Sequence, residues 1–292
     1  TKSLLANNGV VYVMNRVVSP ADYAAVIAPA LYNSNTQVMR TVVRADDSYI
    51  QGSDYSRAPL KQYFSTYLKA MQSRFSFFIP EDEGLNTYGY VDPASMANSK
   101  NVSNFRYYRF RPGDTRGLSG ALAVDAWPVT YKPATGQQPG DKILNGTTFA
   151  SPANQALNSA LGSVKRALLI EMVNHHIIVH GSDDTKGVES DQKYFLSRDG
   201  APVIVKTSNR GVGMEVNGGF QEEVAGTPAA YTSTVKEVYD LTRETNKGYG
   251  NGKTYILDRP MQATTVTAYK AIKDKTQFKK FLDLCTGMST AL

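Results

Sequence analysis

The sequence predicts an α+β protein in which helices come first along the chain and a meandering β-sheet follows. Apolar residues recur at spacings of three and four over residues 59–72 and again over residues 151–174, as on one face of an amphipathic helix. Between residues 175 and 239, short β-branched runs alternate with turn residues, as in antiparallel strands. A third observation, a strand repeated near both ends of the chain, indicates how these elements are organised.

The repeated segment is a turn followed by a β-rich run. Residues 8–16 read NGVVYVMNR and residues 251–259 read NGKTYILDR, with four identities and one Asn/Asp exchange in register, a period of about 243 residues (251 minus 8). Such a period predicts a tandem array, an architecture that serves binding or spacing more often than solitary catalysis. We expect residues 10–18 to pack against the rest of the chain, because an uncovered apolar strand is an association hazard. The predicted units are the terminal strand of a preceding module (residues 1–20), a complete module (residues 21–266) and the start of a following module (residues 267–292).

The first half of the complete module predicts helices around one strand. Residues 19–22, Ser-Pro-Ala-Asp, end the preceding strand and open a helix with Pro at its first position. Pro29 should divide the helical pattern that follows into two pieces. Residues 59–72 form the strongest helix prediction, residues 75–80 a buried strand, and residues 81–85 a turn into another helix.

Residues 92–145 change in composition to Asn, Ser, Gly and Pro, and predict an insertion that contains a hairpin or two. Within it, residues 105–111 alternate arginines with aromatics, so a strand would carry both kinds on each face. Such faces can stack on sugars or bases and pair with anions. The other interpretation is a hairpin that covers the module's own core with its arginine stems lying flat. The candidate binding residues are Arg106, Tyr107, Tyr108, Arg109 and Trp127.

The second half predicts a meander after the helix at residues 151–174. Asp199-Gly200 and Asn217-Gly218 have the composition of hairpin turns. Residues 271–292 carry apolar residues that predict a further helix, with the single cysteine, Cys285, buried on it. The predicted strands are residues 175–180, 194–197, 202–207, 212–216, 219–224, 233–239 and 253–259.

Three of these segments, in this order, resemble the sequence boxes of fasciclin-like domains. They are residues 77–83, residues 174–181 and residues 251–259, of which residues 8–16 are a second copy. The resemblance implies a fasciclin-like β-wedge or sandwich with helices packed on one side, enlarged by the insertion. Both His175 and His176 are candidates for the family's histidine. The residues to which the resemblance gives structural roles are Pro80, Glu83, His175, His176, Gly181, Asn251, Gly252, Tyr255 and Asp258.

The same resemblance implies a non-enzymatic module of cell-surface adhesion, or of protein or matrix binding, that needs no cofactor. Its partner would be a protein or glycan on a cell surface or in the matrix. The location implied is extracellular or at the cell surface of a bacterium, as an outer-membrane lipoprotein whose lipid anchor lies upstream. The alternative function is a carbohydrate-binding protein of a glycan-uptake system, with Tyr107, Tyr108 and Trp127 as stacking platforms. An enzyme with its site in the insertion is disfavoured, because the insertion's acids are sparse.

Composition and motif searches exclude several other classes. A net charge of +6 is modest and its lysines and arginines are scattered, which argues against a nucleic-acid partner. No apolar run reaches the roughly 18 to 20 residues that span a bilayer. In a strand, His176 and His180 would stand about 13 Å apart at ~3.3 Å per residue, too far to share a metal ion. The acidic residues 182–191 lack the alternating layout of a calcium loop, and residues 81–83 are expected to form a turn and helix cap, not paired catalytic carboxylates.

Overall fold

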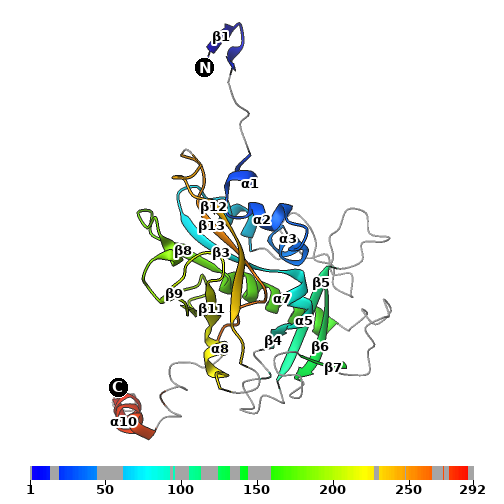
Figure 1. The fold of residues 1–292 in the computed structure, drawn as a ribbon, viewed down its shortest axis with the longest axis vertical. Coiled ribbons are helices and arrows are strands. Elements are labelled where there is room, and N and C mark those ends of the chain that lie inside the picture. The colour runs from blue at the N-terminus through cyan, green and yellow to red at the C-terminus, as the bar shows by residue number, and fades with distance from the viewer. Residues whose placement is uncertain are drawn as a thin grey trace.

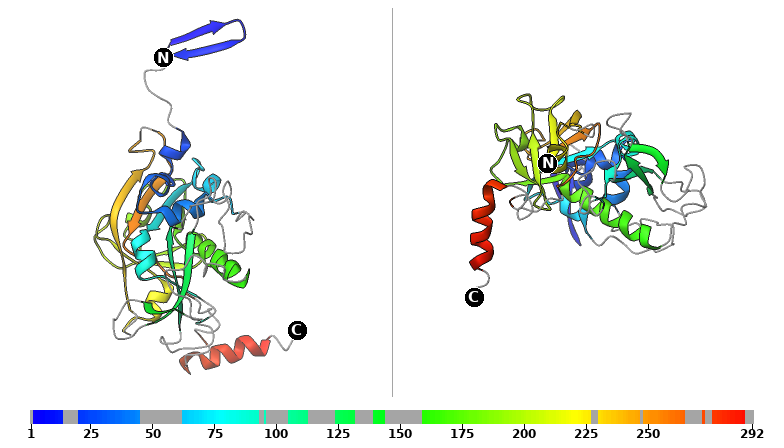
Figure 2. Two further views of the ribbon diagram at one scale, coloured as in Figure 1. Left: turned by 90° about the vertical axis from the view of Figure 1, so that its right-hand side faces the viewer. Right: turned by 90° about the horizontal axis from the view of Figure 1, so that it is seen from below.

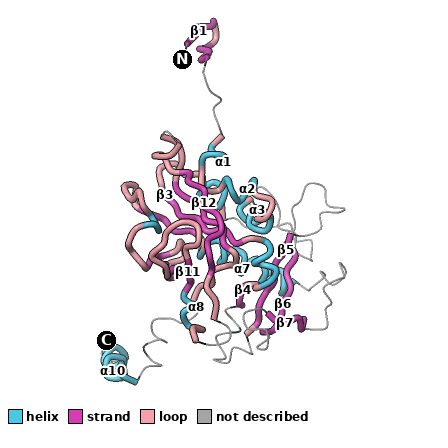
Figure 3. Tube along the Cα trace, viewed as in Figure 1, coloured by secondary structure: helices cyan, strands magenta, loops and turns pink. Residues whose placement is uncertain are grey.

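The protein is mixed α+β, as predicted, with one large sheet, one smaller sheet and several helices (Figures 1 and 3). The large sheet and most helices belong to the predicted complete module. The computed structural model describes residues 2–13, 20–44, 62–92, 95, 105–112, 124–131, 139–143, 159–226, 230–246, 248–264, 272 and 276–288.

The large sheet has seven strands and nearly closes on itself. All neighbouring strands are antiparallel except β13 and β3, which run parallel. The two edge strands, β8 and β9, meet in one bridge between Ile178 and Ser197, and the Arg198 N–H donates to the Ile177 carbonyl at 2.7 Å. In spatial order the strands are β8 (Ile177–His180), β3 (Arg74–Pro80), β13 (Gly252–Leu257), β12 (Ser233–Leu241), β11 (Glu215–Gly218), β10 (Pro202–Val205) and β9 (Tyr194–Leu196).

Strand β3 lies between β8 and β13 and is buried along its whole length. Alternate side chains of a strand face opposite ways, so β3 contributes to two cores. Phe75, Phe77 and Ile79 pack with the helices, whereas Phe78 packs with Tyr255 inside the curved sheet, ring centroids 5.0 Å apart. Burial on both faces explains why residues 75–80 read as an unbroken apolar run.

Most helices of the module lie on one side of the large sheet, as Figures 1 and 2 show. Pro29 stands in the first turn of α2, so the predicted break is confirmed, but the region forms three short helices where two pieces were expected. The helices are α1 (Ala21–Ala24), α2 (Ala28–Tyr32), α3 (Gln37–Val43), α4 (Phe64–Leu68), α5 (Asp82–Thr87), α7 (Ser159–His175), α8 (Gly219–Glu223) and α10 (Lys279–Met288), with 3-10 turns η5 (Gly187–Glu189) and η6 (Thr276–Phe278).

The helix predicted over residues 59–72 is wrong in extent. Residues 59–61 lie outside the described part of the chain, and α4 begins only after Tyr63, which adopts a left-handed conformation with φ 51°. At the other end, the side-chain amide of Asn251 donates to the carbonyls of Leu68 (2.8 Å) and Ala70 (3.3 Å). A distant strand therefore satisfies the carbonyls that a longer helix would have used.

The predicted insertion contributes three strands of a second, four-stranded antiparallel sheet, consistent with the expected hairpins. Its strand β5 is covered on both faces, because Phe105 and Tyr107 pack with Phe220 of α8 while Tyr108 and Phe110 join the helical core. The strands in order are β4 (Tyr90–Val91), β5 (Arg106–Pro112), β6 (Val124–Tyr131) and β7 (Pro139–Ile143).

One part of the predicted meander is a helix. Residues 219–224 were expected to form a strand after an Asn217-Gly218 hairpin turn, but Gly218 ends β11 and caps α8, and its N–H donates to the Gln221 side chain at 2.6 Å. A Cβ at Gly218 would stand 2.0 Å from the Gln262 carbonyl oxygen, so close packing explains this glycine. The Asp199-Gly200 turn is confirmed: Gly200 has φ +81° and the Ser197 N–H donates to the Ala201 carbonyl.

The repeated segment at the N-terminal end contributes β2 (Gly9–Val13), which forms a hairpin with β1 (Lys2–Ala6). The expectation that residues 10–18 pack against the rest of the chain is wrong for residues 10–13, because β2 pairs only with β1 among the described residues and its side chains are exposed. Figure 1 shows the hairpin apart from the other elements. Residues 14–18 and the side chain of Cys285 lie outside the part that the structure describes.

Candidate functional site

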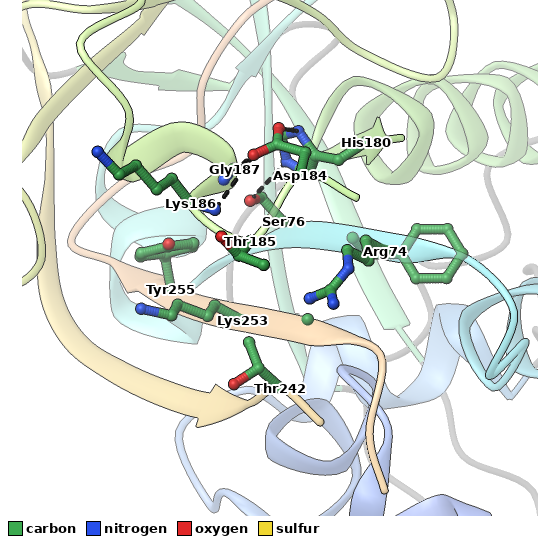
Figure 4. Close-up of a pocket in the computed structure, with 12 residues that line it drawn as sticks. Arg74, Ser76, His180, Asp184, Thr185, Lys186, Gly187, Thr242, Lys253 and Tyr255 are labelled. Carbon is green, nitrogen blue, oxygen red and sulfur yellow. Dashed lines mark hydrogen bonds and ion pairs between the residues drawn. The ribbon is translucent and has the colours of Figure 1, made fainter. Parts of the chain in front are cut away.

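A polar pocket lies where β3, β8 and β13 meet the loop of residues 181–190, which we call the strap (Figure 4). Arg74 and Ser76 alternate along β3 and face the pocket, and Lys253 and Tyr255 face it from β13. This pocket is the candidate that residue chemistry favours, because it gathers serine, histidine, aspartate, lysine and arginine side chains in one place.

Ser76, His180 and Asp184 form a hydrogen-bonded chain in this pocket. Ser76 Oγ lies 2.9 Å from His180 Nε2, and His180 Nδ1 lies 3.2 Å from Asp184 Oδ2. Burial lowers the pKa of His180, although Asp184 opposes the shift. A neutral imidazole that donates from Nδ1 to Asp184 and accepts the Ser76 hydroxyl proton at Nε2 fits these distances.

A serine–histidine–aspartate chain invites comparison with nucleophilic catalysis, but the surroundings disfavour it. A Cβ built on Gly187 would stand 3.2 Å from Ser76 Oγ and 3.1 Å from His180 Nε2, so the strap backbone covers the hydroxyl where a substrate carbonyl would have to lie. The N–H groups of Lys186 and Gly187 donate to Asp184 Oδ1, so they are not oriented to stabilise an oxyanion. The chain instead fastens the strap to β3.

Two cationic side chains of the pocket, those of Arg74 and Lys253, are paired with carboxylates. Arg74 makes two hydrogen bonds to Glu244, at 2.5 and 3.1 Å, and a third to the Ser182 carbonyl. Lys253 lies 2.6 Å from Glu189, which also accepts the Tyr255 hydroxyl at 3.1 Å. The charges of Arg74 and Lys253 are therefore already compensated within the protein.

His175 and His176, the two candidates for the family histidine, occupy the junction of α7 and β8. His176 Nδ1 bonds the Met172 carbonyl at 2.6 Å and its Nε2 accepts the Met261 N–H at 3.0 Å, so both ring nitrogens are used. Burial lowers the pKa of His176 to about 3. His175 is also fully buried, and its Nδ1 lies 3.3 Å from Ser197 Oγ. Of the two, His176 has the complete hydrogen bonding of a structural junction residue.

Four residues of the third sequence box, residues 251–259, have structural roles. Asn251 accepts the Val26 N–H at 2.8 Å, in addition to its two bonds to the α4 end, and so joins three segments. Gly252 has φ +148°, and a Cβ there would stand 1.9 Å from the Phe75 carbonyl oxygen. Tyr255 is buried, and Asp258 accepts the Thr234 N–H at 2.7 Å.

The first sequence box, residues 77–83, also has structural roles. Pro80 ends β3 opposite Leu257, and Glu83 accepts the Thr87 hydroxyl at 2.8 Å. The capping carboxylate is Asp82, which accepts the N–H groups of Gln37 and Val38 at 2.8 and 2.9 Å and thereby caps α3 and not its own helix. Burial raises the pKa of Asp82 to about 6. Gly181, of the second box, starts the strap and has no atoms within 4 Å of its Cβ position.

Two of the five candidate binding residues of the insertion, Tyr107 and Tyr108, are part of the core. Tyr107 and Tyr108 are 6% and 1% exposed, so their rings cannot serve as stacking platforms in this structure. Arg106 is exposed, and the Arg109 side chain donates to the Asn86 carbonyl. The backbone of Trp127 pairs opposite Arg109, whereas its side chain lies outside the described part. The burial pattern favours the interpretation of a hairpin that covers its own core.

An exposed apolar patch occurs where the large sheet nearly closes. The bridge between Ile178 and Ser197 places Val179 opposite Leu196 on the outer face, and Tyr194 lies two residues farther along β9 on that face. Val179, Tyr194 and Leu196 are 44%, 67% and 67% exposed. We call these three residues the seam patch. Single-sequence reasoning missed it because the pairing of β8 with β9 cannot be read from the chain.

The described residues were also searched for clusters of metal-ligating side chains and for helices that could span a membrane. They contain no group of three or more His, Cys, Asp or Glu side chains placed to hold a metal ion. None of the helices found there combines the length and the apolar content that crossing a membrane requires.

Comparison of the sequence with models of known protein families gives no match, and no curated protein matches it either. The fasciclin-like resemblance therefore rests on the three sequence segments alone and stays a prediction.

Proposed function

We propose that the protein is a non-enzymatic binding module of the fasciclin-like class, one of several in tandem, that acts in adhesion at a cell surface or in the extracellular matrix. Three features support the class. The sheet nearly closes with helices on one side, the box residues Asn251, Gly252 and His176 hold separate segments together, and the closing strand occurs twice.

The seam patch is the observation that carries a binding role. Exposed apolar side chains scattered singly are ordinary on protein surfaces, but adjacent ones on two strands mark interaction sites. Val179 and Leu196 lie opposite each other, Tyr194 lies two residues along β9 on the same face, and β8 and β9 are the two end strands of the large sheet. Tyrosine is enriched among the residues that carry most of the binding energy at protein–protein interfaces, so Tyr194 is the residue of the seam patch that best fits a protein partner.

The structure gives no comparable support to the alternative of glycan uptake. That function used Tyr107 and Tyr108 as platforms, and both rings are buried. Catalysis has little support either, since the strap covers the Ser76 hydroxyl. The location at a bacterial surface, through a lipid anchor upstream, is part of the same proposal and predicts that protease added to intact cells cleaves the protein.

The proposed function is tested by binding of the purified chain to immobilised collagen, laminin and fibronectin, with a glycan array as a second arm. Tyr194→Ser with Leu196→Ser should reduce binding to a matrix protein at least tenfold. Tyr249→Ser is the control, because Tyr249 is 65% exposed, close to the 67% of Tyr194, but belongs to the loop before β13 and not to β8 or β9. Binding to glycans alone, or an equal loss in the control, contradicts the proposal.

A further inference from the structure

The β1–β2 hairpin is an exposed element whose sequence is that of a buried one. Val10 and Tyr12 face one way and Val11 and Val13 the other, and all four are 47 to 64% exposed. A strand that is apolar on both faces is typical of the interior of a sheet covered on both sides. A two-stranded hairpin alone is only marginally stable in water, so this hairpin is built to be covered.

The pairing of β1 with β2 repeats the pairing of β12 with β13. Gly9 lies opposite Ala6, as Gly252 lies opposite Leu241, and Tyr12 lies opposite Ser3, as Tyr255 lies opposite Val238. The correspondence continues to Lys2, opposite Val13, and Glu237, opposite Ile256. The connecting loops differ, with residues 7–8 in one copy and residues 242–251 in the other. The second strands of the two hairpins therefore share sequence and each pairs antiparallel with the strand before it, although the first strands and the loops differ.

The edge of β13 that faces away from β12 shows which kind of strand the free edge of β2 would bind. In the complete module this edge pairs in parallel with β3, with Gly252 opposite Phe75 and Tyr255 opposite Phe78. On β2, the corresponding edge has no strand partner among the described residues.

A sequence correspondence at the other end of the chain supports the same organisation. Thr36-Gln37-Val38 begins α3, and Thr276-Gln277-Phe278 forms η6 directly before α10. Val38 is fully buried in the module, whereas Phe278 is 42% exposed and Phe281 is 56% exposed. An uncovered apolar helix thus follows the complete module, just as an uncovered apolar hairpin precedes it.

We propose that β1 and β2 are the last two strands of a preceding module of the same fold, and that the free edge of β2 binds a strand of the β3 type. That strand runs parallel to β2, is apolar on both faces and places an aromatic residue opposite Tyr12. This inference rests on the tandem array of the proposed function, but it concerns the hairpin and not the seam patch, so the two can fail separately.

The direct test supplies the missing strand. A second copy of residues 20–236 is fused directly ahead of Lys2, because Lys2 corresponds to Glu237 in register. The added residues should fold, and hydrogen exchange at Val10 to Val13 should slow at least 100-fold relative to the unextended chain. Tyr12→Asp in the fusion should unfold the added copy and leave the original module folded. Exchange that is as fast as in the unextended chain, beside a folded added copy, overturns the proposal.

If the added copy does not fold, the proposal is tested by grafting the sequence of β2 onto β13 in the unextended chain. Lys253→Val, Thr254→Val and Ile256→Val give β13 the sequence GVVYV of β2, and the module should keep a cooperative unfolding transition. The matched control moves the tyrosine by one position, giving GVYVV, and should unfold the module because a one-residue shift reverses the faces. Equal stability of the two grafts overturns the proposal. A dimer of the unextended chain that Val11→Lys dissociates also overturns it, since the occupant is then a second copy.

Discussion

The hairpins β1–β2 and β12–β13 end in similar strands, with four identities over nine positions, but have opposite environments. Val10 to Val13 are exposed, whereas Thr254 to Leu257 are completely buried between β3 and β12. The local sequence of residues 9–13 and 252–257 forms a strand in both environments, each paired antiparallel with the strand before it. Burial depends on β3, which lies more than 170 residues before β13 in the chain. The comparison separates what a segment encodes by itself from what its module adds.

The glycine that opens each strand should give the largest difference. Gly252→Ala would place a Cβ 1.9 Å from the Phe75 carbonyl at φ +148°, whereas Gly9 has nothing within 4 Å. We expect Gly252→Ala to cost more than about 5 kcal/mol or to prevent folding, and Gly9→Ala to stay within about 0.5 kcal/mol. Urea unfolding followed by circular dichroism measures both. Similar costs at the two positions would show that the hairpins are not differently packed.

The tyrosines provide the next largest contrast. Tyr255 is fully buried and stacks on Phe78, whereas Tyr12 is 64% exposed. Removing a buried aromatic ring typically costs about 3 to 5 kcal/mol, so Tyr255→Ala should lower the free energy of unfolding by about 4 kcal/mol. Tyr12→Ala should change it by less than about 0.5 kcal/mol. A large cost at Tyr12 in the same denaturation experiment would mean that the hairpin is covered in solution.

The asparagines sharpen the comparison further. Asn251 bonds Val26, Leu68 and Ala70, and its removal leaves their buried backbone groups without these bonds. Since each orphaned group costs about 1 to 3 kcal/mol, Asn251→Ala should destabilise by about 3 kcal/mol, whereas Asn8→Ala in the exposed turn should be nearly neutral. Thermal unfolding of the two variants compares them. An unchanged midpoint for Asn251→Ala would contradict the role of Asn251 in joining these segments.

Acid should weaken the complete module through His176, which bonds the backbone of Met261 after β13. Burial holds the folded-state pKa of His176 at about 3, below the ordinary value near 6.5. The unfolded chain thus binds the extra proton first, and stability falls as pH falls from about 6.5 toward 3, by about 1.4 kcal/mol per pH unit. Asp82 and Glu171, whose pKa values burial raises to about 6 and about 7, act in the opposite direction.

A matched variant isolates the histidine from these carboxylates. His176→Gln has no group that titrates there, so the difference in unfolding free energy between the native chain and this variant should shrink as pH falls from 6 to 4. A difference that stays constant over this range would show that His176 does not remain neutral in the folded protein.

Segments whose structure is determined by residues next to them in the chain were predictable from sequence. The strand at residues 75–80, the turn at Asp199-Gly200 and the closing strand all follow from composition and period. The prediction of a helix over residues 59–72 was wrong in extent because Asn251, far along the chain, binds the carbonyls at the end of α4. The prediction of a strand over residues 219–224 was wrong. Gly218 packs closely on Gln262, and the chain continues from there as the helix α8.

The sites were less predictable than the elements, since a site depends on which strands become neighbours. The β-branched run of residues 177–179 predicts a strand, but only its pairing with β3 brings His180 to Ser76. The alternation of arginines and aromatics in β5 gave its two faces correctly, yet both faces meet other elements and are covered. The seam patch needs the contact of the first and last strands of the sheet, which no local pattern contains.

Amide hydrogen exchange on the unmodified chain at low concentration tests the central contrast most directly. The amides of Thr254, Tyr255 and Ile256 should exchange only through global unfolding, while those of Val10 to Val13 should exchange through local opening, at least 1000-fold faster. That result would establish two copies of one hairpin, one covered by its module and one not. Equal protection of the two strands would contradict this account.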